Sequence, residues 1–558
     1  MIRRDQWIPV DGLTLEPNAM SAATISKENV VVSAGPGAGK TELLAQRADF
    51  LLRTGECPYP RRILAVSFKV DAARNLRERV RLRSGPQLAA RFDSLTFHAF
   101  AKRIIDNFRP ALTGYNALSP GYRIDPDTRI AGEQVTFADL VPLALEIIET
   151  NAYARGGIRQ TYSHVFLDEF QDCTDQQYQL VKAAFDPKTA ILTAVGDTKQ
   201  RIMTWAGALD GVMQTFADDF SAQPLPLYQN FRSAPRLRRM QNRMISRMDP
   251  GAVSPVKEPT DDDGVIDVLK FDSERDEAKA IANIIEQWLK EGVPPHEISI
   301  LVRQQPHLVA AALCSELTLR GIPFRNEQQS QDLSAEPVAA LIFNFIRIVA
   351  TNRQPHAYAE LMRVVHQSSN SENESARFDS RLKGILHSAR ATVHSSTFEA
   401  ENPAAWGTLI GEFLSLVSRP VLTALSPSYE QGTRLDDVIE QAHKAFYREL
   451  FVDGDANQAL RRLSEVDAIR ILTIHKCKGL EFDKVVVLGV ETQLFWADPI
   501  TAISEFFVAI SRAKYHLVLT YAKRRVRPDG ATTRWHSQRT PHREFLEFAH
   551  EDALTASG

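Results

Sequence analysis

A glycine-rich segment near the amino terminus, residues 34–41 (AGPGAGKT), has the residue types and spacing of a phosphate-binding loop. Its glycines let backbone N–H groups converge on phosphate oxygens, and the amino end of a following helix adds a favourable dipole. Lys40 would reach the β- and γ-phosphates of a nucleotide, and the Thr41 hydroxyl would bind Mg²⁺. A glycine-rich turn without a ligand is the alternative. The predicted nucleotide contacts are Gly35, Gly37, Ala38, Gly39, Lys40, Thr41 and Glu42.

Two adjacent acids, Asp168 and Glu169, follow an apolar run that predicts a buried strand. A phosphate site needs one acid to hold Mg²⁺ and a second group to position or deprotonate water. We expect Asp168 to share the metal with Thr41, and Glu169 to act as the base. Alone, two acids at a strand end also suit a solvated turn, but together with Lys40 they indicate a nucleotide site.

The elements that must position these residues alternate between strands and helices. Residues 30–32, 63–68, 164–168 and 190–196 are apolar runs typical of strands buried in a parallel sheet. Apolar residues at helical spacing predict a helix directly after the glycine-rich loop. Strands that alternate with helices predict a right-handed parallel α/β sheet, which would carry the phosphate site.

The same pattern restarts later in the chain. Residues 265–271, 298–302, 469–474, 484–488 and 516–521 are predicted strands, whereas 336–464 has few strand signals. The chain is therefore expected to hold two α/β domains, each with a mainly helical insertion. The predicted division is 1–100 with 161–226 for the first domain, 101–160 for its insertion, 227–335 with 465–545 for the second domain, 336–464 for its insertion, and 546–558 for a C-terminal tail.

Several motifs resemble those of superfamily 1 DNA helicases of the UvrD/Rep/PcrA type. Besides the glycine-rich loop they include DEFQD from residue 168, VGDTKQ from 195, TIHKCKGLEF from 473 and VAISRAK from 508. They occur in family order from about residue 15 to about residue 523. The resemblance implies two RecA-like P-loop NTPase motor domains, with ATP and Mg²⁺ bound between them and single-stranded DNA lying across both.

The resemblance also implies roles for further residues at the nucleotide. Gln200 is similar to the glutamine that senses the γ-phosphate, and Arg232 would contact that phosphate. Arg512 would be an arginine finger delivered across the cleft, a device that contributes about 10³–10⁵ in rate. Phe231 would stack near the adenine, and Gly479 and Glu481 would face the nucleotide. Surface ion pairs are the alternative for Arg232 and Arg512.

On the DNA side, Phe68 and Trp205 resemble aromatic residues that stack on bases, a contact that does not read sequence. The segment Thr96, Phe97 and His98 matches a DNA-contacting motif, and Thr473 and His475 would also lie near the DNA. The three aromatic residues could instead belong to the core, and His475 could be a buried hydrogen-bonding histidine. The arginines at 236, 238, 239, 243 and 247 suit either phosphate contacts or a solvated surface.

One departure from the family concerns adenine recognition. The family often has a glutamine upstream of the loop, and residues 15–19 contain none. Asn18 could supply an amide in its place, so adenine selectivity stays open.

Composition narrows the class of protein further. Lys and Arg number 66 and Asp and Glu 69, so the net charge is −3 and any basic DNA-binding surface must be local. Four widely spaced cysteines form no CxxC pair, which disfavours a zinc ribbon or a disulfide framework. No run of 18 apolar residues and no apolar leader is present in the sequence, so we expect a soluble cytoplasmic protein without a membrane partner.

The sequence therefore predicts an ATP-dependent DNA helicase or translocase. It would move 3′ to 5′ on single-stranded DNA, act at single-strand/duplex junctions and unwind duplex DNA, and its pathway stays open among DNA repair, replication restart, plasmid maintenance and antiviral defence. The alternative is a DNA-activated ATPase subunit of a repair or anti-phage (Gabija-like) complex, which would sense or clear DNA beside a nuclease or repair partner. The short stretch after Arg512 leaves no room for a nuclease domain, so we expect that this chain alone does not cut DNA.

Overall fold

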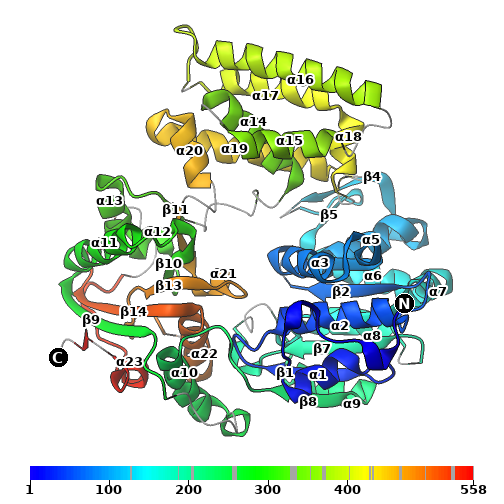
Figure 1. Ribbon diagram of the computed structural model, residues 1–558, viewed down its shortest axis with the longest axis horizontal. Coiled ribbons are helices and arrows are strands. Elements are labelled where there is room, and N and C mark those ends of the chain that lie inside the picture. Colours follow the sequence, from blue (N-terminus) through cyan, green and yellow to red (C-terminus); the bar gives the residue numbers. More distant parts are fainter. Residues whose placement is uncertain are drawn as a thin grey trace.

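The computed structural model describes residues 1–68, 70–125, 128–186, 188–202, 207–253, 260–326, 333, 336–351, 354–366, 372–400, 402–426, 429, 433–463, 468–496, 498–528, 535–553 and 555–556. Figure 1 shows two α/β units side by side, with a helical unit above them in the view. Two parallel sheets flanked by helices confirm the predicted α/β class. No helix within the described ranges is long and apolar enough to cross a membrane.

The first unit is built on a six-stranded sheet in the order β3-β2-β6-β7-β1-β8, in which every pairing is parallel. The predicted strands at 30–32, 63–68, 164–168 and 190–196 are confirmed. The two edge strands, β3 and β8, were not predicted, because FDSLT and QPLPL lack a continuous apolar run. The strands are β1 (Val30–Ala34), β2 (Arg62–Ser67), β3 (Phe92–Thr96), β6 (Tyr162–Leu167), β7 (Ile191–Gly196) and β8 (Gln223–Leu227).

Helices cover both faces of this sheet, so its central strands are buried on both sides. The first of them after the glycine-rich loop begins at Lys40 and ends at Thr54, where Gly55 in the left-handed conformation stops it. The helices are α1 (Pro17–Thr24), α2 (Lys40–Thr54), α3 (Val70–Ser84), α4 (Pro86–Ala89), α8 (Asp175–Ala184) and α9 (Val212–Phe220).

The insertion in the first unit was expected to be mainly helical, and it contains a pair of strands as well as helices. It contains α5 (Phe97–Phe108), α6 (Phe137–Thr150) and α7 (Ala152–Thr161), and also the paired strands β4 (Leu118–Asp125) and β5 (Gly132–Thr136). Most residues of these two strands stay at least partly exposed, because the pair has a core on one side only. Such half-exposed strands lack the continuous apolar run on which the prediction relied.

The second unit has a seven-stranded sheet in the order β11-β12-β10-β13-β14-β9-β15, again with parallel pairings. The five predicted strands of this unit are confirmed. The strands are β9 (Val265–Ser273), β10 (Ile298–Val302), β11 (Phe324–Asn326), β12 (Ile469–Thr473), β13 (Phe482–Val487), β14 (Ala513–Arg524) and β15 (Thr555–Ala556). The helices are α10 (Pro235–Met248), α11 (Glu274–Lys290), α12 (Pro306–Val309), α13 (Ala311–Leu319), α21 (Ile474–Cys477), α22 (Pro499–Ile510) and α23 (Arg543–His550).

The C-terminal segment belongs to the second unit and is not a separate tail. Its helix α23 buries Phe545, Leu546 and Ala549, and β15 pairs with β9 at the edge of the sheet. Arg243 of α10 reinforces this docking, since its guanidinium donates to the Phe548 carbonyl oxygen at 2.6 Å. The sequence-based boundary at 546 therefore divides a segment that packs as one piece.

The helical unit comes from residues 336–463, where the described residues form helices and no strand. It has a core of its own, in which the rings of Phe345 and Phe413 stack with centroids 4.4 Å apart. The helices are α14 (Pro337–Ala350), α15 (Pro355–His366), α16 (Glu372–Val393), α17 (Pro403–Val417), α18 (Arg419–Ala424), α19 (Arg434–Asp453) and α20 (Ala456–Leu463).

A buried ion-pair network holds the second sheet to its helices. Arg525, directly after β14, has a side chain only 2% exposed. Its guanidinium lies 2.7 Å from Glu277 Oε2 on α11, and its Nε donates to Glu491 Oε1 at 2.8 Å. Both carboxylates are buried as well, and Arg525 is the cation that they share, although Glu491 also lies 3.7 Å from Arg539.

We expect the Arg525→Leu variant to be less stable than the wild type by about 3–5 kcal/mol, because it removes the cation that two buried carboxylates share and leaves Glu277 unpaired. The measurement is the urea midpoint for unfolding. Arg524→Leu is the matched control, since the neighbouring arginine is exposed. Equal shifts of the midpoint in the two variants would contradict a stabilising role for the network.

Candidate functional site

The glycine-rich loop joins β1 to α2, at the carboxyl edge of the first sheet. Gly37 and Gly39 have positive φ angles of 71° and 76°, which favour glycine. A Cβ atom on Gly37 would lie 2.2 Å from Asn230 Oδ1, so only glycine permits this close approach. The Phe231 N–H donates to the Gly37 carbonyl oxygen at 2.9 Å. The loop therefore packs directly against residues 230–232, which connect the first unit to the second.

Lys40 and the two acids surround the same loop. The Lys40 Nζ atom donates to the Ala34 carbonyl oxygen at 3.3 Å, so the ammonium group folds back over the loop. Asp168 follows β6 and is 4% exposed, and Glu169 has a φ angle of 52°, which is unusual for a residue other than glycine. The Gln171 side-chain amide donates to Glu169 Oε2 at 2.6 Å. Side chains that were predicted from separate motifs thus meet at one edge of the sheet.

The two acids have opposite pKa shifts. Burial and the negative charge of Glu169 raise the pKa of Asp168, against the opposing charge of Lys40. Burial would also raise the pKa of Glu169, but the ammonium groups of Lys40 and Lys478 outweigh it and hold that pKa below its usual value. Glu169 is therefore ionised and able to accept a proton, as a general base must be.

The oxygen atoms near the loop fit a magnesium ion. Mg²⁺ in nucleotide sites is held by one or two protein oxygens together with phosphates and water, and it favours carboxylate and hydroxyl ligands. The Thr41 hydroxyl at the start of α2 and the buried Asp168 carboxylate are such donors. Among the described residues no group of three or more His, Cys, Asp or Glu is arranged to hold a metal ion.

Two arginines of the second unit lie at the interface with the first. Arg512 is 1% exposed, and its Nη2 atom donates to Gln200 Oε1 at 2.8 Å. Arg232 donates from Nε to Glu481 Oε2 at 2.7 Å and from Nη1 to the Ser511 carbonyl oxygen at 3.0 Å. Burial lowers the pKa of Arg512 to about 10, so the guanidinium is still charged at neutral pH. A surface ion pair is thus excluded for Arg512, whereas Arg232 does pair with Glu481.

Lys478 is a residue of this interface that the sequence did not single out. Its Nζ atom donates to Asp172 Oδ2 and to the Gln200 carbonyl oxygen, both at 2.5 Å, and the side chain is 3% exposed. It joins the TIHKCKGLEF segment of the second unit to the DEFQD segment of the first. The sequence signal that could have identified Lys478 is its position between two recognised motif residues, Thr473 and Gly479.

The predicted DNA contacts of the first unit need one correction. Phe97 is 1% exposed and lies in the core, because α5 packs its apolar face onto the sheet. Its ring supports Phe68, whose centroid is 5.2 Å away and whose side chain is half-buried. Phe97 is therefore not a base-stacking residue in this structure. Thr96 caps α5 by accepting the Ala99 N–H at 3.1 Å.

Two further DNA predictions for the first unit have different outcomes. The His98 ring stands edge-on to Phe137, with centroids 6.2 Å apart, and burial lowers the pKa of His98. Phe137 is half exposed, so these two rings reach the surface together. Trp205 lies outside the described residues.

In the second unit, Thr473 and His475 lie where β12 ends. The Thr473 hydroxyl caps α21 by accepting the Lys476 N–H at 3.3 Å. His475 Nε2 is 3.5 Å from Glu505 Oε1, and Glu505 also accepts a hydrogen bond from Arg303 Nε at 3.0 Å. From Thr473 the chain then crosses to Glu481, immediately before β13 begins. The segment 473–481 therefore links the carboxyl edge of this sheet to its amino edge, where Arg232 and Arg512 lie.

The arginines of α10 are largely committed to contacts inside the protein. Arg239 Nε and Arg243 Nη2 lie 2.9 and 2.6 Å from the Asp552 carboxylate, and Arg236 donates to the Asp552 carbonyl oxygen at 3.3 Å. Arg239 also binds Asp262 at 3.0 Å. These three arginines hold the C-terminal segment, which corrects the option that they contact DNA phosphates.

Asn18 is also engaged within the protein. Its amide donates to the Pro226 carbonyl oxygen at 2.7 Å, and the neighbouring Glu16 carboxylate accepts the Tyr228 and Gln229 N–H groups. The segment 16–18 thus anchors the end of β8, next to residues 230–232.

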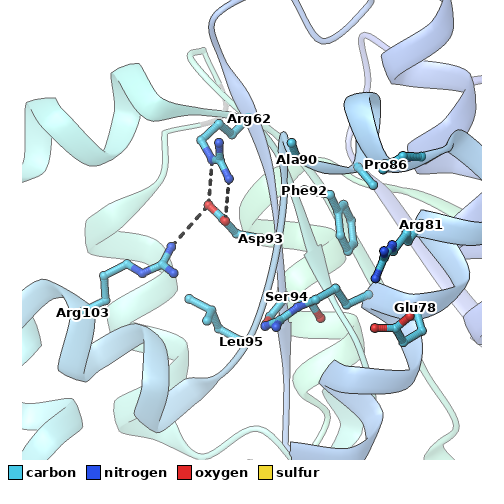
Figure 2. Close-up of a pocket in the computed structure, with 12 residues that line it drawn as sticks. Arg62, Glu78, Arg81, Pro86, Ala90, Phe92, Asp93, Ser94, Leu95 and Arg103 are labelled. Atoms are coloured by element: carbon cyan, nitrogen blue, oxygen red, sulfur yellow. Dashed lines mark hydrogen bonds and ion pairs between the residues drawn. The ribbon is translucent and has the colours of Figure 1, made fainter. Parts of the chain in front are cut away.

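A surface pocket of about 410 Å³ lies beside the edge strand β3 (Figure 2). The Asp93 carboxylate accepts hydrogen bonds from Arg62 at 2.7 and 2.9 Å, and it lies 3.3 Å from Arg103. Burial would raise the pKa of Asp93, but these arginines hold it below its usual value. Three strands separate β3 from β1, so the pocket is distinct from the nucleotide site. Its ion pairs fasten the sheet edge.

Comparisons with known families agree with this geometry. Residues 18–206 match a family model described as an AAA domain, and residues 225–383 and 428–524 match the UvrD-like helicase C-terminal domain. The division between the two matches falls at residues 207–224, close to the segment that joins the two α/β units.

Individual relatives have low sequence identity to this chain but match it over most of its length. The chain is 23% identical to DNA helicase II of Escherichia coli over 92% of its length and 85% of that protein. It is 23% identical to ATP-dependent DNA helicase PcrA of Bacillus subtilis, covering 92% of this chain and 83% of the relative. Identity to DNA helicase II of Haemophilus influenzae is 25%, where the match spans 72% of this chain and 61% of the relative.

Proposed function

Because the chain belongs to the UvrD/Rep/PcrA type of superfamily 1 helicases, we propose that it is an ATP-dependent DNA helicase that translocates on single-stranded DNA. The observation that carries the proposal is the contact between Arg512 and Gln200, which joins the two α/β units beside the phosphate loop. A motor of this kind must convert a change at one nucleotide into a movement between two units. A buried hydrogen bond between them suits that task.

The residues divide the hydrolytic chemistry between the two units. From the first unit, the loop N–H groups and Lys40 bind the phosphates, and Thr41 and Asp168 hold Mg²⁺, which neutralises charge on the phosphates when bound. Glu169 accepts the proton of the attacking water. From the second unit, Arg512 and Arg232 stabilise negative charge that develops on the transferred phosphoryl group.

Hydrolysis is coupled to DNA through two connections. Gln200 accepts a hydrogen bond from Arg512, and its own amide donates to Asp197 Oδ2 at 2.8 Å, so it responds to both units. In the second unit, the segment 473–481 carries Thr473 and His475 at one end and Glu481 at the other. A shift of Glu481 and Arg232 on hydrolysis thus changes the position of the DNA-side residues.

The substrate follows from the same proposal. Single-stranded DNA and its junctions with duplex DNA are the binding partners, and movement is 3′ to 5′, as the family resemblance implies. Phe68 and Trp205 supply base stacking from the first unit, where such contacts contribute about 1–3 kcal/mol per base without reading the sequence. A nuclease or repair protein as a further partner belongs to the alternative function.

The Lys40→Ala variant is expected to hydrolyse ATP at least about 10²–10³-fold more slowly than the wild type, since a preorganised cation at the phosphates is lost. The measurement is steady-state ATP hydrolysis with and without single-stranded DNA. The wild type should be stimulated by DNA, and Lys40→Ala should be inactive in both conditions while it still binds DNA. Full hydrolysis by Lys40→Ala would refute the site, and equal wild-type rates with and without DNA would refute a DNA motor.

A further inference from the structure

An exposed tryptophan, Trp496, stands at the carboxyl edge of the second sheet. It lies in the loop that connects β13 to α22, two residues before the Asp498 N-cap of that helix. The residue is 64% exposed, although its neighbours Leu494 and Phe495 are buried in the core. A large aromatic side chain that is exposed to water directly after two core residues is a candidate for a binding contact.

The Trp496 ring is fixed by an arginine. The Arg303 guanidinium lies over the ring, 4.7 Å from its centroid. Arg303 is itself only 10% exposed, and it is held by its ion pair with Glu505, which is 1% exposed. One face of the indole is therefore occupied by a positioned cation, and the exposed remainder of the ring is available to a planar ligand.

The position of Trp496 identifies the ligand. Strands β12, β10 and β13 are parallel neighbours, and they are followed at their carboxyl ends by Thr473, Arg303 and the loop with Trp496. Glu505 binds both Arg303 and His475, so the indole and the residues of the proposed DNA contact belong to one cluster. Arg512 and Glu481 lie at the opposite, amino edge, which excludes the adenine of the nucleotide as the ligand of this ring.

We propose that Trp496 stacks on a base of the single-stranded DNA and that Arg303 is its positioning residue. The inference rests on the proposed function and extends it, because it gives the second unit an aromatic contact to match Phe68 of the first. A motor that steps must hold DNA with each unit in turn. Stacking suits this holding, because every base presents a flat aromatic face.

The test is a scan with DNA oligonucleotides that carry one abasic site at successive positions, which removes one base and leaves the phosphates in place. Binding of each oligonucleotide by the full chain is measured for the wild type and for Trp496→Ala. On unmodified DNA the variant should bind about 5- to 150-fold more weakly, the range that corresponds to one stacked base. At one abasic position the wild type should lose affinity, and Trp496→Ala should show no further loss.

Three variants complete the experiment. Trp496→Phe should recover most of the affinity. Arg303→Lys should lose part of it on unmodified DNA and show no further loss at that abasic position, because lysine keeps the charge but not the planar stack. Tyr59→Ala is the matched control: Tyr59 is 82% exposed and also has an arginine, Arg91, over its ring, but it precedes β2 at the amino edge of the first sheet. It should bind DNA as the wild type does.

Two results would overturn the inference or its premise, and they differ. If the wild type binds the oligonucleotides but Trp496→Ala loses as much affinity as the wild type does at every abasic position, the stacking role is wrong. The helicase function then still stands. If the wild type itself binds no single-stranded DNA, the proposed function fails.

Discussion

Replacement of Arg512 by lysine should lower the rate of ATP hydrolysis by about 10³-fold or more, the range associated with an arginine that acts on the transferred phosphoryl group. Hydrogen bonds from all three nitrogens position the buried guanidinium: Nη1 donates to the Leu480 carbonyl oxygen at 3.0 Å, Nε donates to the Val508 carbonyl oxygen at 2.9 Å, and Nη2 donates to Gln200. Lysine keeps the charge but cannot reproduce this planar set of hydrogen bonds. The measurement is single-turnover hydrolysis at saturating ATP, with nucleotide affinity determined in parallel.

Arg524→Lys serves as the control for this prediction, since that arginine is exposed and lies in the same unit. Its hydrolysis rate should equal that of the wild type. An Arg512→Lys variant that hydrolyses ATP within about 10-fold of the wild type would contradict an arginine that acts across the interface.

The second large effect is expected at Glu169. Glu169→Gln should reduce hydrolysis by about 10²–10⁴-fold, the typical contribution of a general base, and leave the affinities for ATP and DNA close to those of the wild type. Lys40 and Lys478 lower the pKa of Glu169 and keep its carboxylate ionised. The amide of glutamine is neutral and cannot accept the proton in its place. Glutamine has nearly the same shape, so the loss would report on proton transfer rather than on packing.

For Glu169 the decisive readout is a rapid-quench measurement of phosphate formation in the first turnover. Glu149→Gln, an exposed acid at the end of α6, is the control and should behave as the wild type. A normal first turnover in Glu169→Gln would move the base elsewhere, and weak ATP binding would point to a structural role for this residue instead.

The central strands of both sheets could be predicted because strands that are buried on both faces consist of continuous apolar runs. Residues 30–32 and 298–302 are apolar runs, and both lie in strands flanked by partners on either side. The edge strands β3 and β8 could not be found in this way. An edge strand has solvent on one side and tolerates proline and polar residues, as FDSLT and QPLPL show.

The residues of the nucleotide site could be predicted, but the contacts between the two units around it could not. The residues within the loop are sequence neighbours, and so are the two acids, so that local spacing is enough to recognise each motif. In contrast, Lys478 and Asp172 are 306 residues apart, and Arg512 and Gln200 are 312 residues apart. No local pattern specifies such pairs, because only the packing of the two units brings them together.

Burial of aromatic and basic side chains was equally dependent on the fold. Phe68 and Phe97 are both aromatic residues of recognised motifs, yet the fold buries one and leaves the other half-exposed. The basic helix α10 has the sequence of a phosphate-binding surface, but the C-terminal segment supplies Asp552 to neutralise it. In each case the sequence shows the type of side chain, and a distant segment decides what it contacts.

The most direct test of the proposed function is strand separation of tailed DNA duplexes by the purified chain. With ATP and Mg²⁺, the wild type should separate a duplex with a 3′ single-stranded tail and leave one with a 5′ tail intact, and Lys40→Ala should separate neither. ATP hydrolysis that depends on DNA but separates neither substrate would favour a DNA-activated ATPase that acts within a complex. Strand separation by Lys40→Ala equal to that by the wild type would contradict a motor driven by ATP at this site.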